Sequence, residues 1–422
     1  MKTLVLTLEY PTRASYYTDW RDAFQRSRSF DATVRNVFHA SVRRRLAAEM
    51  ADYELIVVLH SCTADTLDYV ADLVSPLLHR RGRLVCIVGN ELNLPWAPLG
   101  RKLAWLKSVA PDIIATQLLA EAGEWLYADI GACVLALPHA LNPEAFRPEL
   151  PQSAREIDIG ARSWRYLAYL GDDDRNRIYD YFANTRFEPP LRLDFSTEQR
   201  FDRGGWAGFL NRCKATISTE AGSWYLERDD ATVLAIRDHA AHPGGIMLRA
   251  DSPLQRLARR LPYRVKTLLR RWLRGGFVSH EALNAEDLDF ADIHRSFFAE
   301  RARAPVYAKA ISSRHFDAIG CKTLQIMFPG RYNDILRAGE HYVALAPDFS
   351  NIDAVLAVLR DVRSREVIVE RAYGEIIAGH TYTNRLSTLL AALQQRVVGS
   401  QPRGEAIRQS TAEVMPPHVR TS

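Results

Sequence analysis

The 422-residue sequence contains no run of about 18 uncharged apolar residues, which is the length that a membrane-spanning helix requires. The apolar run after Met1 is short and ends at Glu9, so we expect no signal peptide. The five cysteines are scattered and form no CxxC pair. This spacing excludes a disulfide or zinc framework and predicts reduced thiols in a cytoplasm.

Several catalytic signatures are also missing. The first apolar run is followed by Glu9-Tyr10-Pro11-Thr12 instead of GxGxxG, and no Walker A, HExxH or GxSxG sequence is present. These absences argue against dinucleotide, P-loop, zinc-protease and α/β-hydrolase chemistry. We expect no cofactor and no bound metal.

Lysine is scarce: only 7 of the 55 basic residues are Lys.

The net charge of +5 is local, because residues 252–280 carry eight basic side chains and no acidic one. The remainder has 47 basic and 50 acidic residues, by subtraction from 55 and 50. A basic surface extending over the whole protein is thus excluded, and we expect no nucleic-acid partner.

Short apolar runs alternate with helical patterns along most of the chain. LIVVLH (55–60) and RLVCIV (83–88) are continuous apolar runs, which is typical of strands buried on both faces of a parallel sheet. Helical spacing is expected at 63–78 and 118–127, and again at 172–182, 206–212 and 366–395. The alternation predicts an α/β protein with two Rossmann-like parallel-sheet domains facing a central cleft.

The predicted boundaries follow changes in composition. The Pro-rich segment PHALNPEAFRP begins at Pro138, so we predict an N-terminal domain over 1–140, a linker over 141–152 and a C-terminal domain over 153–395. The basic residues 252–280 are an insertion in the second domain. Residues 396–422 are polar and contain three prolines, which predicts a disordered tail.

Two segments could bind phosphate. In Gly171–Arg175 (GDDDR), the carboxylates could chelate a divalent ion that bridges a diphosphate. A helix N-cap explains these carboxylates better. Ser312 and Ser313 open a helical pattern whose free N–H groups could bind phosphate oxygens, and Arg314 adds a guanidinium fork. Asp317, on the same helix, could accept two hydrogen bonds from a ribose diol. The alternative is a capped helix that packs on the sheet.

The segment HFDAIGCKTLQIMFPGRYNDILRAGEHYVAL (315–345), followed by Phe349-Ser350-Asn351-Ile352, resembles the C-terminal donor-binding block of group 1 glycosyltransferases. It is most similar to the branch that includes spore-maturation-type glycosyltransferases. PHALNPEAFRP, WLY (125–127) and HTYTNR (380–385) also resemble that branch. The resemblance implies the GT-B fold, a nucleotide-sugar donor in the C-terminal domain and an acceptor facing the N-terminal domain.

The sequence departs from this family at one motif. Many members carry two Glu residues with seven residues between them, and these positions fall on Lys309 and Asp317 here. The resemblance also implies a basic pair that neutralises the leaving diphosphate, which would be Arg200 and Arg203. Surface arginines are the alternative. Gly222 and Ser223 follow the strand at 215–218, at the sheet edge where ligands bind.

Three residues are candidates for proton transfer from an acceptor hydroxyl. Glu91 follows the strand RLVCIV at its carboxyl end and is our first choice. Asp19 is the rival, although an Asp at a helix start is more often a cap. His139 lies in the linker and could reach either domain, although a lone His is more often structural.

The basic insertion contains an amphipathic pattern over 254–274, LQRLARRLPYRVKTLLRRWLR. We expect it to bind an anionic membrane surface through Leu, Trp and Arg side chains. The alternative is a helix that packs on the domain and pairs with the acidic stretch 286–292. Together these features predict a cytoplasmic, metal-independent glycosyltransferase that uses a nucleotide-sugar donor and a glycan or lipid-linked acceptor. The rival is a catalytically silent module that binds nucleotide or glycan.

Overall fold

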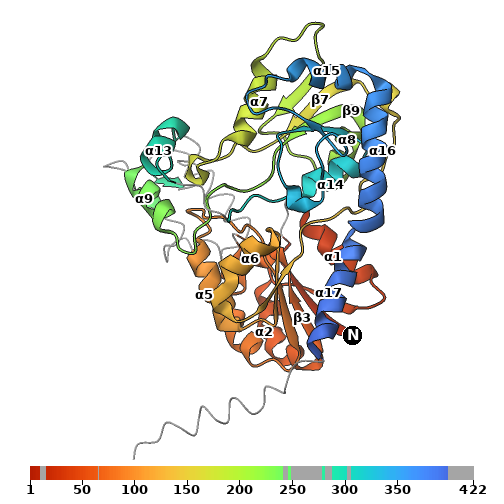
Figure 1. The fold of residues 1–422 in the computed structure, drawn as a ribbon. Helices are drawn as coiled ribbons and strands as arrows, with labels where there is room; N and C mark the ends of the chain where they lie inside the picture. Colours follow the sequence, from red (N-terminus) through yellow and green to blue (C-terminus); the bar gives the residue numbers. More distant parts are fainter. Residues whose placement is uncertain are drawn as a thin grey trace, which may run out of the picture.

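The computed structural model describes residues 1–9, 16–64, 66–240, 246–248, 278–280, 288–301 and 306–397. They form two lobes, each built on a parallel β-sheet covered by helices (Figure 1). The strand order is β2-β1-β3-β4-β5-β6 in the first sheet and β8-β7-β9-β12-β13 in the second. In both sheets the first strand lies between the second and the third, which creates a switch point where ligands bind. The predicted pair of Rossmann-like domains, the GT-B arrangement, is confirmed.

The N-terminal sheet is buried on both faces, with one apolar core on each side. The continuous apolar runs LIVVLH and RLVCIV form central strands of this sheet, as expected for a parallel sheet covered on both faces. The strands are β1 (Lys2–Thr7), β2 (Asp31–Asn36), β3 (Leu55–Val58), β4 (Arg83–Ile87), β5 (Ile113–Thr116) and β6 (Cys133–Ala136).

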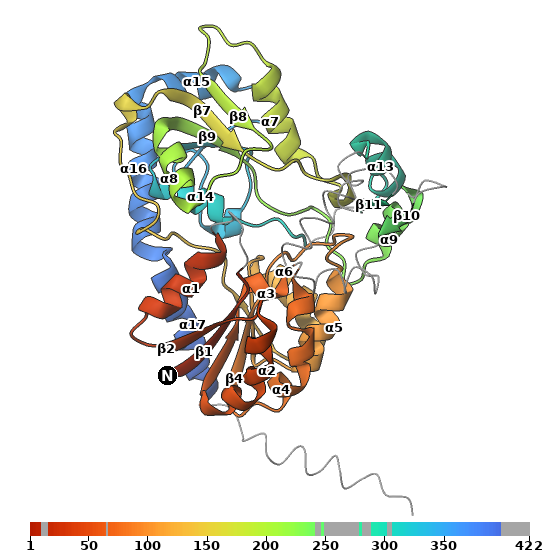
Figure 2. The same ribbon diagram turned by 180° about the vertical axis from the view of Figure 1, so that it is seen from behind.

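The helices of this domain are α1 (Tyr16–Arg26), α2 (Ala40–Glu49), α3 (His60–Thr63), α4 (Val74–Leu78), α5 (Leu99–Val109) and α6 (Ala120–Tyr127). The single helix expected over 63–78 is replaced by α3, two 3₁₀ turns and α4, which lie beside the sheet in Figure 2. Pro76 lacks an N–H donor, so a long uninterrupted helix through this segment is disfavoured.

The C-terminal sheet has five parallel strands. These are β7 (Ile157–Arg162), β8 (Leu193–Ser196), β9 (Cys213–Ser218), β12 (Leu324–Met327) and β13 (Val343–Ala344). The helices around it are α7 (Asp174–Asn184), α8 (Arg203–Arg212), α14 (Ser313–Gly320), α15 (Ile352–Arg360) and α16 (Val362–Gly379).

The chain crosses between the domains twice, and the two crossings touch. Leu141 donates its N–H to the carbonyl of His380 at 2.9 Å and accepts from the N–H of Tyr382 at 3.2 Å. The single helix expected over 366–395 is broken here into α16 and α17 (Tyr382–Val397). Helix α17 packs on the N-terminal sheet (Figure 1). Tyr382 at its start is edge-on to Trp20 of α1, with the ring centres 5.0 Å apart. Residues 382–395, expected in the second domain, thus complete the core of the first.

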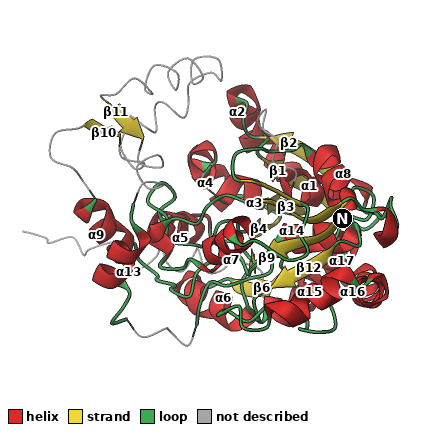
Figure 3. Cartoon of the chain, turned by 90° about the horizontal axis from the view of Figure 1, so that it is seen from above, coloured by secondary structure: helices red, strands yellow, loops and turns green. Residues whose placement is uncertain are grey.

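A small subdomain projects from the C-terminal lobe beside α5, on the side away from α16 (Figures 1 and 3). It contains α9 (Ala231–His239) and α13 (Phe290–Phe297). The parallel strands β10 (Ile246–Leu248) and β11 (Val278–His280) lie between these two helices in the sequence and pair with each other. Most of the basic insertion 252–280, including 254–274, lies outside the described residues, as do residues 398–422 of the expected tail. Among the described helices, none has the length and apolar character needed to cross a membrane.

Candidate functional site

A cleft of about 540 Å³ lies between the two domains. That volume is within the usual range for small-molecule sites, roughly 300–1,000 Å³. Both domains line the cleft, at the carboxyl ends of their strands. Of the residues predicted from sequence, the structure places eight in its walls: Glu91, His139, Arg200, Gly222, Ser312, Ser313, Arg314 and Asp317.

One wall is the N-terminus of α14. Ser312 is its N-cap, and a capping box links Ser312 to His315, the third residue of the helix. The N–H of Ser312 donates to Nδ1 of His315 at 3.0 Å, so the proton is on Nε2, which donates to the hydroxyl of Ser218 at 3.1 Å. Burial lowers the pKa of His315 to about 3, which keeps this ring neutral. The helix start is therefore held rigidly at the end of β9.

The adjacent wall is a two-stranded bridge between 221–223 and 308–310. Ala221 and Ala310 exchange backbone hydrogen bonds of 2.8 Å in both directions. Gly222, with φ of +110°, lies so close to this strand that a Cβ would be 1.8 Å from the carbonyl oxygen of Ala308. Side chains alternate along an extended segment, so Ala308 and Ala310 line the cleft and Lys309 points away from it.

Arginines dominate the C-terminal side of the cleft. Arg162, Arg175, Arg200 and Arg314 all line it. Arg162 pairs with Asp194 at 2.8 Å, whereas Arg175 and Arg314 form no ion pair with any described carboxylate. The guanidinium of Arg175 lies 3.9 Å from the ring centre of Tyr166. Burial, with a further contribution from the charge of Arg314, lowers the pKa of Arg175 to about 10, so it remains charged at neutral pH.

This arrangement is electrostatically unfavourable without a ligand. Burial and the charge of Arg314 also lower the pKa of Arg200. Like charges that converge on a cleft beside a helix N-terminus form a site for an anion with several negative oxygens. Arg162 and Arg175 were missed by the sequence analysis, because a strand end and a DDDR run do not reveal which side chain faces the cleft.

The acidic run 172–174 has another role. Asp173 is the N-cap of α7, but its side chain makes no capping hydrogen bond. Asp172 and Asp174 instead hold the ammonium group of Lys309, at 2.5 and 3.0 Å. Burial alone would lower the pKa of Lys309, but these two charges raise it. The carboxylate pair considered for a divalent ion is thus engaged by a buried lysine that is 1% exposed.

Asp317 lies where α14 meets the floor of the cleft. Its Oδ2 accepts a hydrogen bond from the indole N–H of Trp206 at 3.0 Å, and the residue is 4% exposed. Burial, and secondly the charge of Asp19 from the other domain, raise its pKa well above its ordinary value. A protonated Asp317 could donate one hydrogen bond and accept another from a diol.

Glu91 lines the cleft, but its carboxylate is already occupied by protein donors. It accepts hydrogen bonds from Thr116 Oγ1 at 2.5 Å, the N–H of Gln117 at 2.8 Å and the hydroxyl of Tyr127 at 2.6 Å. Burial raises its pKa, and these donors oppose that shift. Its role as a general base stays a prediction, for which the carboxylate would have to exchange one of these partners.

His139 lies at the cleft floor beside the interdomain crossing. Its Nδ1 is 3.2 Å from the hydroxyl of Tyr382, and its ring is edge-on to His60 at 5.4 Å. Burial, followed by the charge of Arg385, lowers its pKa to about 4. The ring is therefore neutral at pH 7 and carries a nitrogen that can accept a proton.

Three predicted site residues do not line the cleft. Arg203 donates to Asp19 at 3.1 Å and to Asp22 at 2.8 Å, so α8 is joined to α1 across the domain boundary. Asp19 is buried there and also accepts from Asn142 at 2.7 Å. Ser223 donates its hydroxyl to the carbonyl of Leu170 at 2.6 Å. The contact of Arg203 with Asp19 therefore joins the two domains, and that of Ser223 joins two loops of the C-terminal domain.

Aromatic side chains form the remaining wall, and no motif in the sequence indicated them. Trp164, Tyr166, Phe201 and Trp206 all line the cleft. Trp164 is 61% exposed, and the guanidinium of Arg200 lies 4.3 Å from its ring centre. Exposed aromatic faces beside charged groups suit a flat ligand with an anionic end.

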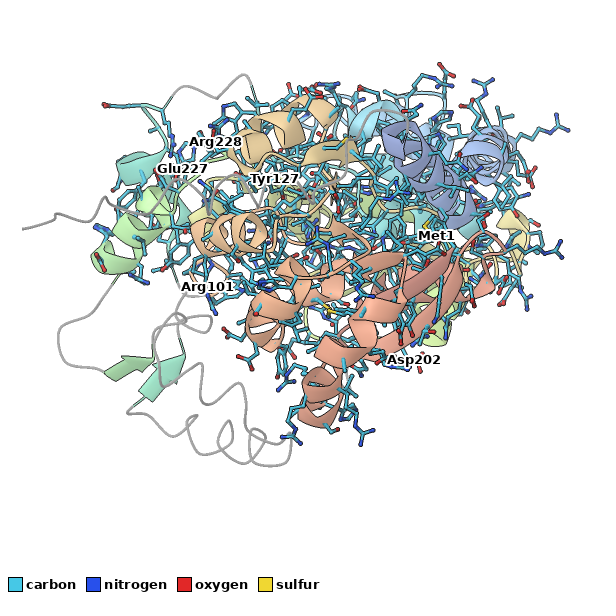
Figure 4. All side chains as sticks on the ribbon, turned by 90° about the horizontal axis from the view of Figure 1, so that it is seen from below. Met1, Arg101, Tyr127, Asp202, Glu227 and Arg228 are labelled. Carbon is cyan, nitrogen blue, oxygen red and sulfur yellow. The ribbon has the colours of Figure 1, made fainter. Side chains whose placement is uncertain are left out.

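Further contacts hold the domains around the cleft. Asp230 accepts hydrogen bonds from the N–H groups of Leu99 and Gly100, at 2.8 and 2.9 Å, and so caps α5. Arg228 stacks on Trp125 of α6 at 4.6 Å; Figure 4 labels Arg228 and Glu227 on this side, near Tyr127. On another side, the amide of Asn333 donates to the carbonyl of Gln117 at 3.0 Å. The cleft is thus closed along more than one edge.

Comparisons with solved structures found weak overall likenesses. The Anabaena protein Alr3699/HepE in complex with UDP-glucose has 8% identity and a TM-score of 0.46, covering 94% of this chain and 100% of its own. A glycosyltransferase from Rickettsia africae has 9% identity and a TM-score of 0.45, covering 94% and 99%. A UDP-forming trehalose-phosphate synthase from Burkholderia vietnamiensis has 10% identity and a TM-score of 0.40, again covering 94% and 99%.

No curated protein sequence matches the chain significantly. Residues 254–391 match a family described as "Glycosyl transferase-like". The matched region includes α14, the bridge strand 308–310 and the arginine at the start of the helix. Over these residues, the chain is similar to a glycosyltransferase-like family.

Proposed function

We propose that the protein is a glycosyltransferase that moves a sugar from a nucleotide-sugar donor to a glycan or lipid-linked acceptor. The observation that carries the proposal is the group of guanidiniums, two of them without carboxylate partners, beside the N-terminus of α14. The diphosphate of a donor carries negative charge, which would neutralise the unpaired positive charge of this wall. Trp164 and Tyr166 offer stacking surfaces for its base or sugar.

The proposed chemistry is charge stabilisation. The arginines and the first N–H groups of α14 would bind the leaving nucleoside diphosphate, so we propose that transfer needs no metal. His139 is the group that we propose accepts the proton of the acceptor hydroxyl. In keeping with the resemblance of its sequence, we place the protein in bacterial surface polysaccharide synthesis, on the cytoplasmic side.

The test is release of nucleoside diphosphate from a panel of UDP-, GDP-, ADP- and dTDP-sugars, with and without a chelator of divalent metals. Release from one donor, unaffected by the chelator, is the expected result. Failure of every nucleoside diphosphate to bind, measured by calorimetry, would contradict the proposal.

The second candidate is a catalytically silent module that binds nucleotide or glycan. The ion-paired Lys309 favours it, because the family position of the first Glu carries a side chain that faces away from the cleft. So does the occupied carboxylate of Glu91. Binding of nucleoside diphosphate without release from any sugar donor would support this candidate.

Changing Asp317 tests the ribose contact. We expect Asp317→Ala to raise the Kd of the nucleoside diphosphate about tenfold or more, because the ribose diol would lose two hydrogen bonds to a neutral carboxyl group, each worth roughly 0.5–1.5 kcal/mol. Asp317→Asn, which keeps one donor and one acceptor, should raise it less. Calorimetry on both variants provides the comparison. Equal affinities of wild type and folded Asp317→Ala would exclude the ribose contact.

Changing His139 tests the proton acceptor. We expect His139→Gln to lower kcat about 100-fold or more, the usual contribution of general-base catalysis. The neutral ring is the active form, and its pKa is about 4. Activity should therefore persist as the pH falls from 7 to about 5 and be lost near pH 4. His239→Gln, on the exposed face of α9, is the control. An acidic limb near pH 6.5 would exclude a buried base.

Residues 254–274 lie outside the described residues, so the membrane contact remains a proposal from sequence. We expect the protein to co-sediment with anionic vesicles at low salt and to be released at high salt, because Arg–headgroup attraction is screened. Neutral vesicles are the control. Equal pelleting on both vesicle types, or on neither, would favour a helix that packs on protein.

A further inference from the structure

Behind the arginines lies a second, smaller cavity. It is a recess of about 30 Å³ at the switch point of the C-terminal sheet. Arg162, Arg175, Trp206 and Arg314 separate it from the cleft and line both spaces. Its inner wall includes Thr216 and Gln325, which are paired neighbours on β9 and β12.

The inner wall carries polar atoms that no described residue satisfies. Gln325 is 1% exposed, and both its amide nitrogen and its amide oxygen lack a hydrogen-bond partner among the described residues. The same holds for Nε of Arg162. A buried carboxamide without partners is disfavoured, so a ligand of the recess must offer both a donor and an acceptor.

A second observation points to the same recess. Arg175 is buried and charged, yet it pairs with no described carboxylate. The face of Tyr166 stabilises one side of its guanidinium, and the recess lies against the residue as well. A buried cation needs polar surroundings in addition to an aromatic face.

We propose that the recess is a binding site for one or two water molecules, which complete the hydrogen bonds of Gln325 and solvate Arg175 behind the anion-binding wall. The volume fits, since one buried water needs roughly 10–15 Å³ of such space. Water can donate a hydrogen bond to the amide oxygen of Gln325, whereas an anion can only accept hydrogen bonds. Gln325 is then a positioning residue that acts on Arg175 through water.

The direct test is a crystal structure of the full chain at a resolution that shows ordered water. We expect one or two density peaks within hydrogen-bond distance of Gln325. A recess without density would overturn the proposal. So would a strong anomalous peak there after a bromide soak, because it would identify an anion site.

Variants test the same point in solution. In Gln325→Leu the waters lose their hydrogen-bond partner, so the melting temperature should fall. A rise would contradict the proposal, because it would show that the amide of Gln325 is buried without water and destabilises the fold. Gln325→Asn, which leaves an amide and room for a further water, should restore much of the loss. Gln25→Leu, on the exposed side of α1 and away from both the recess and the cleft, is the matched control and should leave the melting temperature unchanged.

The effect on Arg175 rests on the proposed function and has its own readout. If water positions Arg175, Gln325→Leu should raise the Kd of a nucleoside diphosphate about tenfold, while kcat at saturating donor changes little. An unchanged Kd in a folded variant would exclude the positioning role. If the wild type binds no nucleotide, the proposed function fails, and the density and melting results still decide whether the recess holds water.

Discussion

Replacing Arg314 with Ala should weaken nucleoside diphosphate binding by about 10- to 100-fold, because each charge-assisted hydrogen bond contributes roughly 1.5–3 kcal/mol. Its guanidinium has no described carboxylate partner, so its removal leaves no buried anion and the fold should survive. The affinity of the wild type should also fall with added salt more steeply than that of the variant. Calorimetry at two ionic strengths measures both effects.

The matched control is Arg360→Ala, an exposed arginine at the end of α15 that donates to the carbonyl of Pro189. It should leave the affinity unchanged. If Arg314→Ala binds as tightly as the control, the guanidinium wall is not the anion site. In that case the observation that carries the proposed function would be lost.

Replacing Lys309 with Met should lower the free energy of unfolding by about 3–5 kcal/mol, the usual result of removing one partner from a buried ion pair. Asp172 and Asp174 would remain close together without a counter-charge. The double variant with Asp172→Asn should recover part of the loss, because one of the two charges is then removed. Urea unfolding of both variants provides the measurement.

Lys322→Met is the matched control for this prediction. Lys322 pairs with Glu370 at 2.6 Å on the surface, where an ion pair contributes only about 0–1 kcal/mol. A loss in Lys309→Met no larger than in this control would mean that the buried triad is not a stabilising unit. Per folded molecule, nucleotide affinity should be close to that of the wild type, because the ammonium group faces away from the cleft.

Much of the fold could be predicted from sequence, because a doubly covered parallel sheet imposes continuous apolar runs. LIVVLH and RLVCIV were recognised for this reason and are β3 and β4 with their flanking residues. The break between α16 and α17 was not recognised. It is set by the bridge of Leu141 to Thr381, a contact between segments 240 residues apart.

Site residues could be predicted where a local sequence motif determines the backbone conformation around them. Ser312, Ser313 and Arg314 open α14, and a helix start exposes N–H groups whatever the rest of the fold. Arg203 was predicted in the cleft, yet Asp19 and Asp22 of the other domain hold it outside. Arg175 was missed for the complementary reason, since only the packed structure shows which residues face the cleft.

The path of α17 determines when the N-terminal domain can finish folding. Leu386, Leu389 and Leu393 are buried against the face of the first sheet that also holds Val5 and Val57. During synthesis, the ribosome releases that sheet long before it releases residues 382–397. Until the helix emerges, this apolar face is covered only in part, by Trp20 and Phe24 of α1, so the first domain made is completed last. Nascent chains stopped after residue 380 should therefore bind chaperones more than chains released beyond residue 397.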